Sequence, residues 1–239
     1  MKQALITGGS GGIGEAICRR LAADGHHVLI HAHSNMRAAE TLAEELNADG
    51  YSAQPVEFDI TDHDAVLAAL SPLTEQAPIQ ILINNAGIHD DAAFPGMTPQ
   101  QWQRVLDVSV NGFYHVTHAL MMPMIRTRWG RIVNLSSIAA ISGNRGQVNY
   151  AAAKGAINSA TRSLALELAS RGITVNAVAP GIIDTAMSRS AFDADAVARL
   201  VPMKRAGTPT EVADLIGFLV SPQAAYITGQ IISINGGMI

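Results

Sequence analysis

The stretch Ala4-Leu5-Ile6-Thr7-Gly8-Gly9-Ser10-Gly11-Gly12-Ile13-Gly14 decides the fold of this chain. A short apolar run leads into a glycine-rich turn, and an apolar helix pattern through Ile17 and Leu21 follows directly. Glycines let the backbone turn tightly and bring its N–H groups, together with the N-terminus of the helix, against a pyrophosphate. An apolar strand, a glycine turn and a helix in this order predict a dinucleotide-binding site and not an ordinary tight turn.

The rest of the chain alternates between short apolar strand patterns and helix patterns. Further strands are expected at residues 28–30, 53–58, 79–83, 131–135, 173–179 and 231–234, and helices at 36–46, 65–70, 102–125, 150–169 and 212–220. Unbroken apolar strands between helices are typical of a parallel sheet covered on both faces. Right-handed crossovers then predict a doubly wound α/β domain of the Rossmann type: a parallel seven-stranded sheet with helices on both faces, which binds ligands at the carboxyl ends of its strands.

Composition narrows the class of protein. Of the 239 residues, 48% are hydrophobic and 15% charged, and no linker or repeat interrupts the pattern, so one globular domain over residues 1–239 is expected. The net charge of −4 without a basic stripe argues against nucleic acid as a partner. No segment approaches the ~18 apolar residues of a membrane span. The absence of a secretion leader and the single cysteine, Cys18, predict a cytoplasmic protein with a buried thiol.

The eight histidines do not suggest a metal site. His31 and His33 alternate onto one face of a strand, and His115 and His118 are three residues apart on a helix. Neither pair has a third ligand at a recognisable spacing. These histidines are therefore expected at the surface or at an interface.

The end of the second strand bears on the type of cofactor. An NAD site usually has an acid there, which accepts hydrogen bonds from the ribose 2′-hydroxyl. This chain has His31-Ala32-His33-Ser34-Asn35 instead, with Arg37 beyond, and such groups can donate to a 2′-phosphate. The sequence thus predicts NADPH in preference to NADH, held by His33, Ser34 and Arg37. The alternative is that these residues only cap the helix that begins near Met36.

Three residues have the chemistry of a carbonyl reductase. Tyr150 and Lys154 are four apart in a helix pattern and so share one face. A phenol titrates near ~10, and a nearby ammonium should lower this pKa, which would make Tyr150 a usable general acid. Ser137 follows the strand at 131–135, where its hydroxyl can donate to a carbonyl oxygen. Each feature alone is common on exposed helices and turns.

Taken together, the motifs resemble those of the short-chain dehydrogenase/reductase family. They are Thr7-Gly8-x-x-x-Gly12-x-Gly14, Asn84-Asn85-Ala86-Gly87, Asn111, Ser137, Tyr150-x-x-x-Lys154 and Pro180-Gly181, in the family's order across essentially the whole chain. The resemblance implies that Tyr150 donates the proton, Ser137 orients the carbonyl and Lys154 holds the nicotinamide ribose. It implies that Asn111 anchors a water. The cofactor contacts it implies are Gly8, Ser10, Gly11, Gly12, Ile13, Gly14, Asp59, Ile60, Asn85, Ala86, Gly87, Tyr150, Lys154, Pro180, Gly181, Ile183 and Thr185. Asp59 has an alternative role as a cap of the following helix.

Within the family, the chain is most similar to 3-oxoacyl-[acyl-carrier-protein] reductases, over residues 149–154, 170–176, 224–229 and 235–238. This similarity implies NADPH-dependent reduction of a 3-oxoacyl thioester on acyl carrier protein. It implies that Arg128 and Arg171 dock the acidic carrier beside the mouth of the active site, although both could simply be solvated loop ends. It also implies a tetramer packed through the helices at 102–125 and 150–169; whether the subunits are identical is left open.

The chain departs from these reductases at two places. Gly11 stands where they commonly have an arginine that reaches the 2′-phosphate, and residues 88–94 differ from the usual sequence beside the cleft. The second departure suggests an unusual acyl chain, such as a polyene intermediate. Residues 187–204 are expected to form a substrate lid. Two other functions are weighed: a reductase of a free alcohol, sugar or steroid, and a non-catalytic cofactor-binding subunit, which would typically lack the tyrosine or lysine.

Overall fold

The seven strands of the sheet are all parallel. The computed structural model describes residues 1–186 and 193–239. In the described residues the strand order is β3-β2-β1-β4-β5-β6-β7. The strands are β1 (Gln3–Ile6), β2 (His27–Ala32), β3 (Ser52–Glu57), β4 (Ile79–Asn84), β5 (Gly130–Leu135), β6 (Ile173–Pro180) and β7 (Ile231–Ile234). The predicted doubly wound α/β fold is confirmed.

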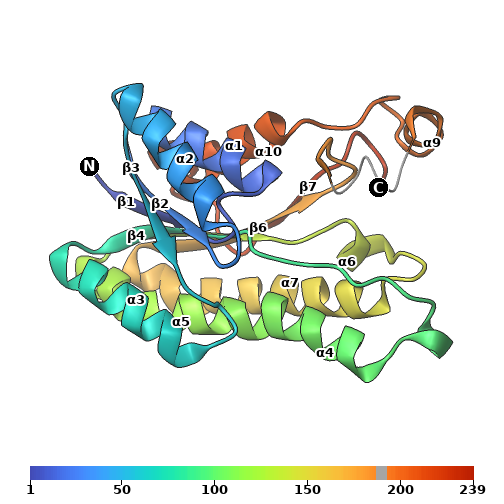
Figure 1. Ribbon diagram of the computed structural model, residues 1–239, viewed down its shortest axis with the longest axis horizontal. Helices are drawn as coiled ribbons and strands as arrows, with labels where there is room; N and C mark the ends of the chain where they lie inside the picture. The colour runs from blue at the N-terminus through green and yellow to red at the C-terminus, as the bar shows by residue number, and fades with distance from the viewer. Residues whose placement is uncertain (187–192) are drawn as a thin grey trace.

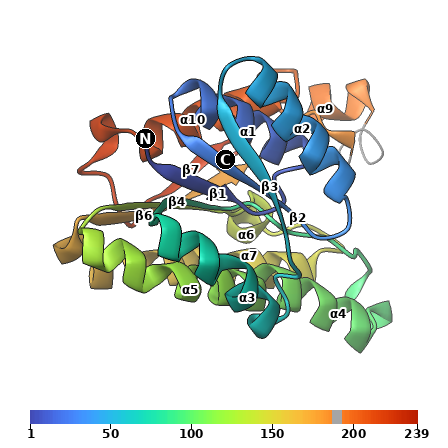
Figure 2. The same cartoon turned by 60° about the vertical axis from the view of Figure 1, so that its left-hand side comes forward.

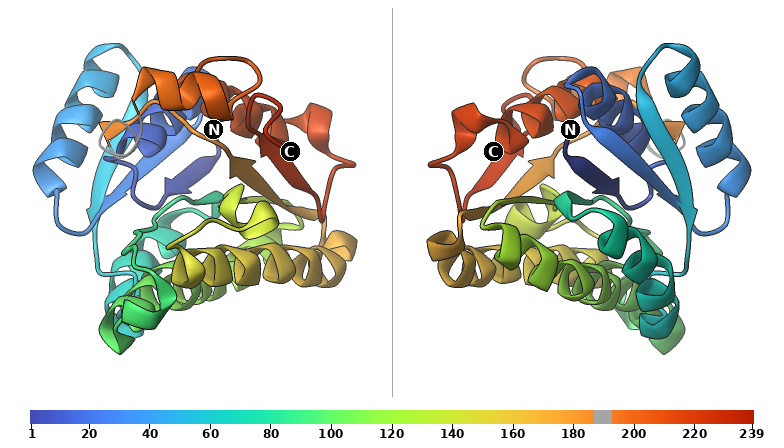
Figure 3. Two further views of the ribbon diagram at one scale, coloured as in Figure 1. Left: turned by 90° about the vertical axis from the view of Figure 1, so that its right-hand side faces the viewer. Right: turned by 90° about the vertical axis from the view of Figure 1, so that its left-hand side faces the viewer.

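Helices cover both faces of this sheet (Figures 1 and 3). One face carries α1 (Gly12–Ala23), α2 (Met36–Ala48) and α10 (Pro209–Val220), and the other carries α3 (His63–Gln76), α5 (Gly112–Thr127) and α7 (Val148–Leu168). Figure 2 shows α3 packed beside α5. Successive side chains of a strand point to opposite faces, so Ala4 and Ile6 join one apolar core and Leu5 joins the other. This double burial explains why β1 is an unbroken apolar run.

The position of β1 creates the crevice in which the site lies. β1 pairs with β2 on one side and with β4 on the other. The chain therefore builds the sheet outward from β1 to β3, and then returns to build the other half from β4 to β7. At such a reversal the connections leave toward opposite faces, and a crevice opens at the carboxyl ends of the two central strands.

The helix predicted over residues 102–125 is longer than expected and changes its winding. It begins as α4 (Pro99–Leu106), where Thr98 and Gln101 form a capping box. The segment η2 (Asp107–Asn111) is a π-helical turn, in which the Gly112 N–H donates to the carbonyl of Asp107. The chain then continues as α5. Apolar spacing does not reveal such a turn, because one extra residue in a turn leaves the apolar pattern on either side intact.

Short helical segments complete the fold. They are η1 (Phe94–Gly96), α6 (Ala139–Ser142), η3 (Ala169–Arg171), α9 (Ala194–Leu200) and η4 (Pro222–Ala224). The predicted lid over residues 187–204 lies partly outside the described residues, which omit 187–192. Its described part contains α9, where the Asp193 side chain accepts a hydrogen bond from the Ala196 N–H at 2.7 Å.

Candidate active site

One large cleft of ≈ 1360 Å³ lies along the carboxyl ends of the strands. It extends from the glycine-rich turn after β1 to the turn after β5 and the start of α7. Most residues predicted to contact cofactor or substrate line it: Gly8, Ser10, Gly11, Gly12, Ile13, Gly14, His33, Ser34, Asp59, Ile60, Asn85, Ala86, Gly87, Ser137, Tyr150, Lys154, Pro180, Gly181, Ile183 and Thr185. The predicted residues outside its lining are Arg37, Asn111, Arg128 and Arg171.

The glycine-rich turn has a conformation that suits a pyrophosphate. Gly8 has a φ of 61°, which side chains with a Cβ rarely adopt. A Cβ on Gly14 would collide with the carbonyl oxygen of Gly8. Gly11 is the N-cap of α1, and because glycine has no side chain with which to cap, the first N–H groups of this helix can bind an anion.

His31 ties this turn to the end of β3. The Gly8 N–H donates to His31 Nδ1 at 3.0 Å, so His31 Nε2 carries the proton and donates to the carbonyl of Phe58 at 2.9 Å. The ring is only 2% exposed, and burial lowers its pKa to about 4. The expectation that His31 lies at the surface or at an interface was therefore wrong. The glycine turn needs an acceptor at this point, and a neutral imidazole supplies it.

Thr7 and Asn85 join the ends of β1 and β4. The Thr7 hydroxyl accepts hydrogen bonds from the N–H groups of Asn85 and Ala86, both at 3.0 Å. In the other direction, the Asn85 side-chain amide donates to the carbonyls of Thr7 and Gly8, at 2.9 and 3.0 Å. These reciprocal bonds set the width of the crevice.

The residues predicted to hold a 2′-phosphate are only partly assembled. His33 and Ser34 are exposed and line the cleft, whereas Arg37 is exposed on α2 outside the lining. Asn35 occupies the N-cap of α2, but its side chain makes no capping hydrogen bond there. The alternative that this segment serves to cap α2 through its side chains therefore finds no support at the N-cap.

Asp59 is held locally and does not cap α3. Its carboxylate accepts hydrogen bonds from the N–H and the hydroxyl of Thr61, both at 2.8 Å. Burial opposes the ionised form, but the Thr61 hydrogen bonds outweigh it and lower the pKa of Asp59. Asp62 is the residue that caps α3, accepting from two backbone N–H groups of its first turn. The alternative capping role of Asp59 was thus wrong.

Ser137, Tyr150 and Lys154 meet in the cleft. Ser137 follows the carboxyl end of β5, and α7 presents Tyr150 and Lys154 on one face. The Ser137 hydroxyl accepts a hydrogen bond from the Ala139 N–H at 3.1 Å and favours the ionised form of the Tyr150 phenol. Lys154 Nζ donates to the carbonyl of Leu135 at 2.7 Å and lies 5.8 Å from the centre of the Tyr150 ring. Two hydroxyls can thus approach one substrate oxygen, with an ammonium behind them.

Burial dominates the acid–base properties of this group. It raises the pKa of the Tyr150 phenol, the Asp91 carboxylate raises it further, and only the Ser137 side chain lowers it. The expected lowering of the Tyr150 pKa by Lys154 is therefore not found, because the ammonium is directed to Leu135 and both groups lie in a poorly solvated pocket. Burial also lowers the pKa of Lys154, to about 8.

The wall of the cleft beside Tyr150 depends on side-chain amides that the sequence analysis missed. The Asn149 amide donates to the carbonyls of Asp90 and Gln101, at 2.9 and 3.2 Å. The Gln147 amide donates to the Asp91 carboxylate at 2.8 Å. These bonds attach the start of α7 to the unusual segment at residues 88–94. The available signal was a pair of amide residues, Gln147 and Asn149, within three positions before Tyr150.

Asn111 is placed away from the other predicted catalytic residues. Its side chain is exposed and donates to the Asp107 carboxylate at 2.8 Å, and it does not line the cleft. The structure therefore does not bring Asn111 to Lys154. The physical reason is its position in the π-helical turn, where it faces outward.

Arg128 and Arg171 lie at the opposite edge of the sheet from Tyr150. Arg128 ends α5 just before β5, and Arg171 lies just before β6, so both are at the amino ends of parallel strands. The Arg128 guanidinium donates to the carbonyl of Ser170 at 3.0 Å, and both side chains are exposed. Within one chain, the expectation that they flank the active-site mouth was wrong, because the cleft borders the carboxyl ends.

Three further features concern the thiol, metal ligands and membrane spans. Cys18 is completely buried, and burial raises its pKa, as expected of a structural thiol. In the part of the chain that the structure describes, no three His, Cys, Asp or Glu side chains are grouped as metal ligands would be. The described helices include none with the length and apolarity to cross a bilayer.

Comparisons with known proteins agree with this geometry. A family model described as "Enoyl-(Acyl carrier protein) reductase" matches residues 8–239. The chain is 43% identical to the 3-oxoacyl-[acyl-carrier-protein] reductase FabG of Aggregatibacter actinomycetemcomitans over 98% of both chains. The chain belongs to the short-chain dehydrogenase/reductase family. It is also 42% identical to FabG of Pseudomonas aeruginosa, over 99% of this chain and 97% of the relative.

A further relative has a name that does not state a reaction. The chain is 41% identical to "Nodulation protein G" of Rhizobium sp. (strain N33), over 99% of this chain and 96% of the relative.

As a short-chain dehydrogenase/reductase, the protein is an oxidoreductase that uses a nicotinamide cofactor. The cleft fits that group: it combines the anion-binding turn after β1 with the hydroxyls of Ser137 and Tyr150.

Because neutral His31 accepts a hydrogen bond from the glycine turn, the stability of the folded protein should depend on pH. The folded protein resists protonation of His31 down to about pH 4, whereas the unfolded chain takes up this proton near its ordinary pKa of 6.5. The contribution of neutral His31 to the free energy of unfolding is complete above pH 6.5. It decreases by about 3 kcal/mol as the pH falls to 4. His31→Phe should flatten this pH dependence in urea unfolding, and should cost about 1–3 kcal/mol at pH 7 because the Gly8 N–H loses its acceptor.

The exposed His118 supplies a control, since His118→Phe should leave both quantities as in the parent. An unchanged pH dependence in His31→Phe would mean that another group is responsible for the acid sensitivity.

Proposed function

We propose that the protein reduces a 3-oxoacyl thioester carried on acyl carrier protein to the 3-hydroxyacyl product, with NADPH as the cofactor. The observation that carries this proposal is the meeting of Ser137, Tyr150 and Lys154 at one end of a cleft whose other end is an anion-binding glycine turn. Both FabG relatives are named for this reaction and match almost their full length.

A reduced nicotinamide bound in the cleft would supply the hydride that the carbonyl carbon needs. Ser137 donates a hydrogen bond to the carbonyl oxygen and orients it, and Tyr150 transfers its proton to that oxygen. The carbon–oxygen π bond is replaced by one C–H and one O–H bond. A raised pKa keeps Tyr150 protonated at neutral pH. Proton transfer to the forming alkoxide remains favourable, because an alkoxide is a stronger base than a phenolate.

Lys154 would serve both the phenol and the ribose. With a pKa of about 8, it is mostly an ammonium at neutral pH. The ammonium lies 5.8 Å from the centre of the Tyr150 ring, and turning from the Leu135 carbonyl toward the phenol would bring its charge close enough to stabilise the phenolate that remains after proton transfer. The Leu135 carbonyl accepts a hydrogen bond from one of the three N–H groups of the ammonium. Another N–H group can therefore donate to a ribose hydroxyl in the cleft.

The preference for NADPH rests on the groups around the adenosine end. His33 and Ser34 line the cleft there and can donate to a 2′-phosphate, and residues 31–35 contain no acid. Arg37 is outside the lining, so it contributes only through its charge. Gly11 has backbone angles that any residue can adopt, with φ −90°, and a Cβ added there would meet only the Gly8 carbonyl oxygen, at 3.6 Å. Position 11 can therefore accept a side chain without strain.

Docking of a carrier protein requires more than one copy of the chain in this proposal. Arg128 and Arg171 are exposed cations, which suit an acidic carrier, but they lie at the edge away from the cleft. An assembly could place them beside the cleft of a neighbouring copy. Large apolar side chains exposed on α5 and α7, Tyr114 at 55% and Leu166 at 84%, support the proposed oligomer packed through these helices.

Replacing the proton donor tests the reaction. Tyr150→Phe should lower kcat for acetoacetyl-carrier protein at least about 100-fold, since general acids contribute roughly that much or more. NADPH binding, followed by fluorescence titration, should persist. Tyr226→Phe is the control, because Tyr226 is fully exposed. Parental turnover in Tyr150→Phe would refute the proposed role of the phenol.

Restoring the missing arginine tests the cofactor assignment. Gly11→Arg should lower the KM for NADPH about tenfold, because a guanidinium–phosphate hydrogen bond is among the stronger ones, and should leave the KM for NADH unimproved. Gly11→Ala controls for the added Cβ, and both variants should fold normally. An equal gain for NADH and NADPH would indicate that position 11 does not face the 2′-phosphate.

The carrier requirement is tested by comparing substrates. Arg128→Ala and Arg171→Ala should each raise the KM for the carrier-bound substrate, together about tenfold, without changing that for a carrier-free ketone. Arg19→Ala is the control, because Arg19 is a partly exposed arginine on α1, on the other face of the sheet from α5 and α7. Equal activity on carrier-free ketones, with no effect of either arginine, would instead favour a reductase of a free alcohol, sugar or steroid.

A further inference from the structure

A carboxylate lines the same cleft as the proposed proton donor. Asp91 belongs to the unusual segment at residues 88–94, and its side chain borders the cleft together with Tyr150. Its negative charge raises the pKa of the Tyr150 phenol, so the carboxylate lies within electrostatic reach of the hydroxyl that would meet the substrate oxygen. No step of the proposed reduction needs this charge.

Polar contacts hold the Asp91 carboxylate in place. One of its oxygens accepts a hydrogen bond from the Gln147 side-chain amide at 2.8 Å. The other oxygen lies 3.3 Å from Nδ1 of His89. Gln147 is the N-cap of α7 and precedes Tyr150 by three positions, so the carboxylate is attached to the helix that carries the phenol.

The backbone around Asp91 is fixed to the same part of the structure. The Asn149 amide donates to the carbonyl of Asp90, and the Ala92 N–H donates to the carbonyl of Gly146, both at 2.9 Å. The Asp90 carboxylate accepts from the Gln101 amide of α4 at 2.8 Å and is outside the lining of the cleft. Of these two neighbouring acids, only Asp91 therefore presents its charge to the cleft.

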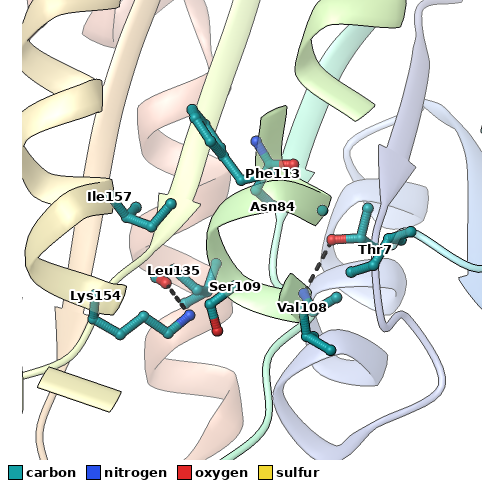
Figure 4. Close-up of a pocket in the computed structure, with 11 residues that line it drawn as sticks. Thr7, Asn84, Val108, Ser109, Phe113, Leu135, Lys154 and Ile157 are labelled. Atoms are coloured by element: carbon teal, nitrogen blue, oxygen red, sulfur yellow. Dashed lines mark hydrogen bonds between the residues drawn. The ribbon is translucent and has the colours of Figure 1, made fainter. Parts of the chain in front are cut away.

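The cation behind the phenol is directed elsewhere. The Lys154 ammonium donates to the Leu135 carbonyl at 2.7 Å (Figure 4). Burial is the cause that lowers the pKa of Lys154, without a contribution from any described carboxylate. Among the described residues the ion pair of Asp91 is with His89, and an imidazole is a cation only when it is protonated. With His89 neutral, the cleft keeps a negative charge near the phenol.

Such a charge distinguishes ketones by the charge that they carry themselves. In a free 3-oxo acid, a single CH₂ group separates the ketone carbon from an ionised carboxylate, whereas in the ester or thioester the same position is neutral. A ketone oxygen at Tyr150 would therefore bring the carboxylate of the acid near Asp91. Like charges repel, and they do so more strongly in a poorly solvated pocket than in water.

We infer that Asp91 is a specificity-determining residue: its carboxylate, held by Gln147, excludes anionic 3-oxo acids from the cleft and admits neutral 3-oxo esters and thioesters. The inference rests on the proposed reduction and adds to it the class of ketone that the cleft rejects. A free 3-oxo acid, which is the hydrolysis product of the thioester, would then not compete with the carrier-bound substrate.

Removing the charge while keeping the hydrogen bond tests the inference. In Asp91→Asn the side-chain oxygen can still accept from Gln147, and the shape is retained. Acetoacetate and methyl acetoacetate are the probes, because they share the ketone and differ in charge. At pH 8, where ordinary imidazoles are neutral, the ratio of kcat/KM for the ester to kcat/KM for the acid should fall about tenfold in Asp91→Asn. The ratio cancels any change at Tyr150 that affects both probes.

Asp90→Asn is the matched control. It removes one negative charge from the neighbouring position, outside the cleft, so its ratio should stay within about twofold of the parental ratio. The parent supplies a second readout, which does not depend on the folding of any variant. Because salt screens the repulsion, the parental ratio should fall as the salt concentration rises from ~0.05 to ~0.5 M.

Several outcomes would overturn the inference. These are an unchanged ratio in folded Asp91→Asn, an equal change in Asp90→Asn, or a parental ratio that does not respond to salt. If Asp91 only anchored the start of α7, its substitution would change the activity on both probes equally.

Failure of the proposed function is recognised separately, because the parental enzyme would then reduce neither the carrier-bound substrate nor methyl acetoacetate. Calorimetric titration of the NADP⁺-loaded protein with the two probes still decides the role of Asp91 in that case, since the repulsion acts on binding. Equal affinities of the parent for the acid and the ester would contradict the inference.

Discussion

Asn85 and Thr7 exchange hydrogen bonds across the two central strands, and the rest of the site depends on that exchange. Adjacent strands that send their connections to opposite faces would otherwise end in two unattached loops. The Asn85 amide holds the carbonyls of Thr7 and Gly8, which sets where the glycine turn begins. His31 holds the next group, the Gly8 N–H, from the other side. An anion-binding turn so restrained is preorganised before any ligand arrives.

Burial gives the ionisable groups of the cleft their character. The same low-polarity surroundings keep His31 neutral, hold Tyr150 protonated and lower the pKa of Lys154. For a reductase these effects agree, because the reaction needs a proton on the phenol at the start and a cation nearby at the end. Burial is least favourable for Lys154, because removing its charged ammonium from water costs free energy. The hydrogen bond from its ammonium to the Leu135 carbonyl offsets part of that cost.

In the function we propose, the chain keeps the reacting groups of its family and varies what surrounds them. Position 11 lacks a side chain that could reach a 2′-phosphate, and the segment bonded to Gln147 and Asn149 gives the cleft an acidic residue, Asp91, close to the phenol. In the proposed reaction, such changes would act on cofactor preference, substrate fit and proton affinity, and would leave the bonds made and broken as they are. Relatives with different names, such as FabG and nodulation protein G, can therefore share one scaffold.

The amino-acid sequence by itself determined the sheet, the glycine turn and the placing of Tyr150 and Lys154 on one helix face. These follow from local periodicity: unbroken apolar strands, glycines after the first strand, and a spacing of four residues. Only the tertiary structure decided that His31 is buried, that Asn111 faces outward, and that Arg128 and Arg171 lie at the far edge. The physical reason is that burial, hydrogen-bond partners and electrostatic surroundings come from residues distant in the chain, and a π-helical turn changes which side chain faces inward without changing the apolar pattern around it.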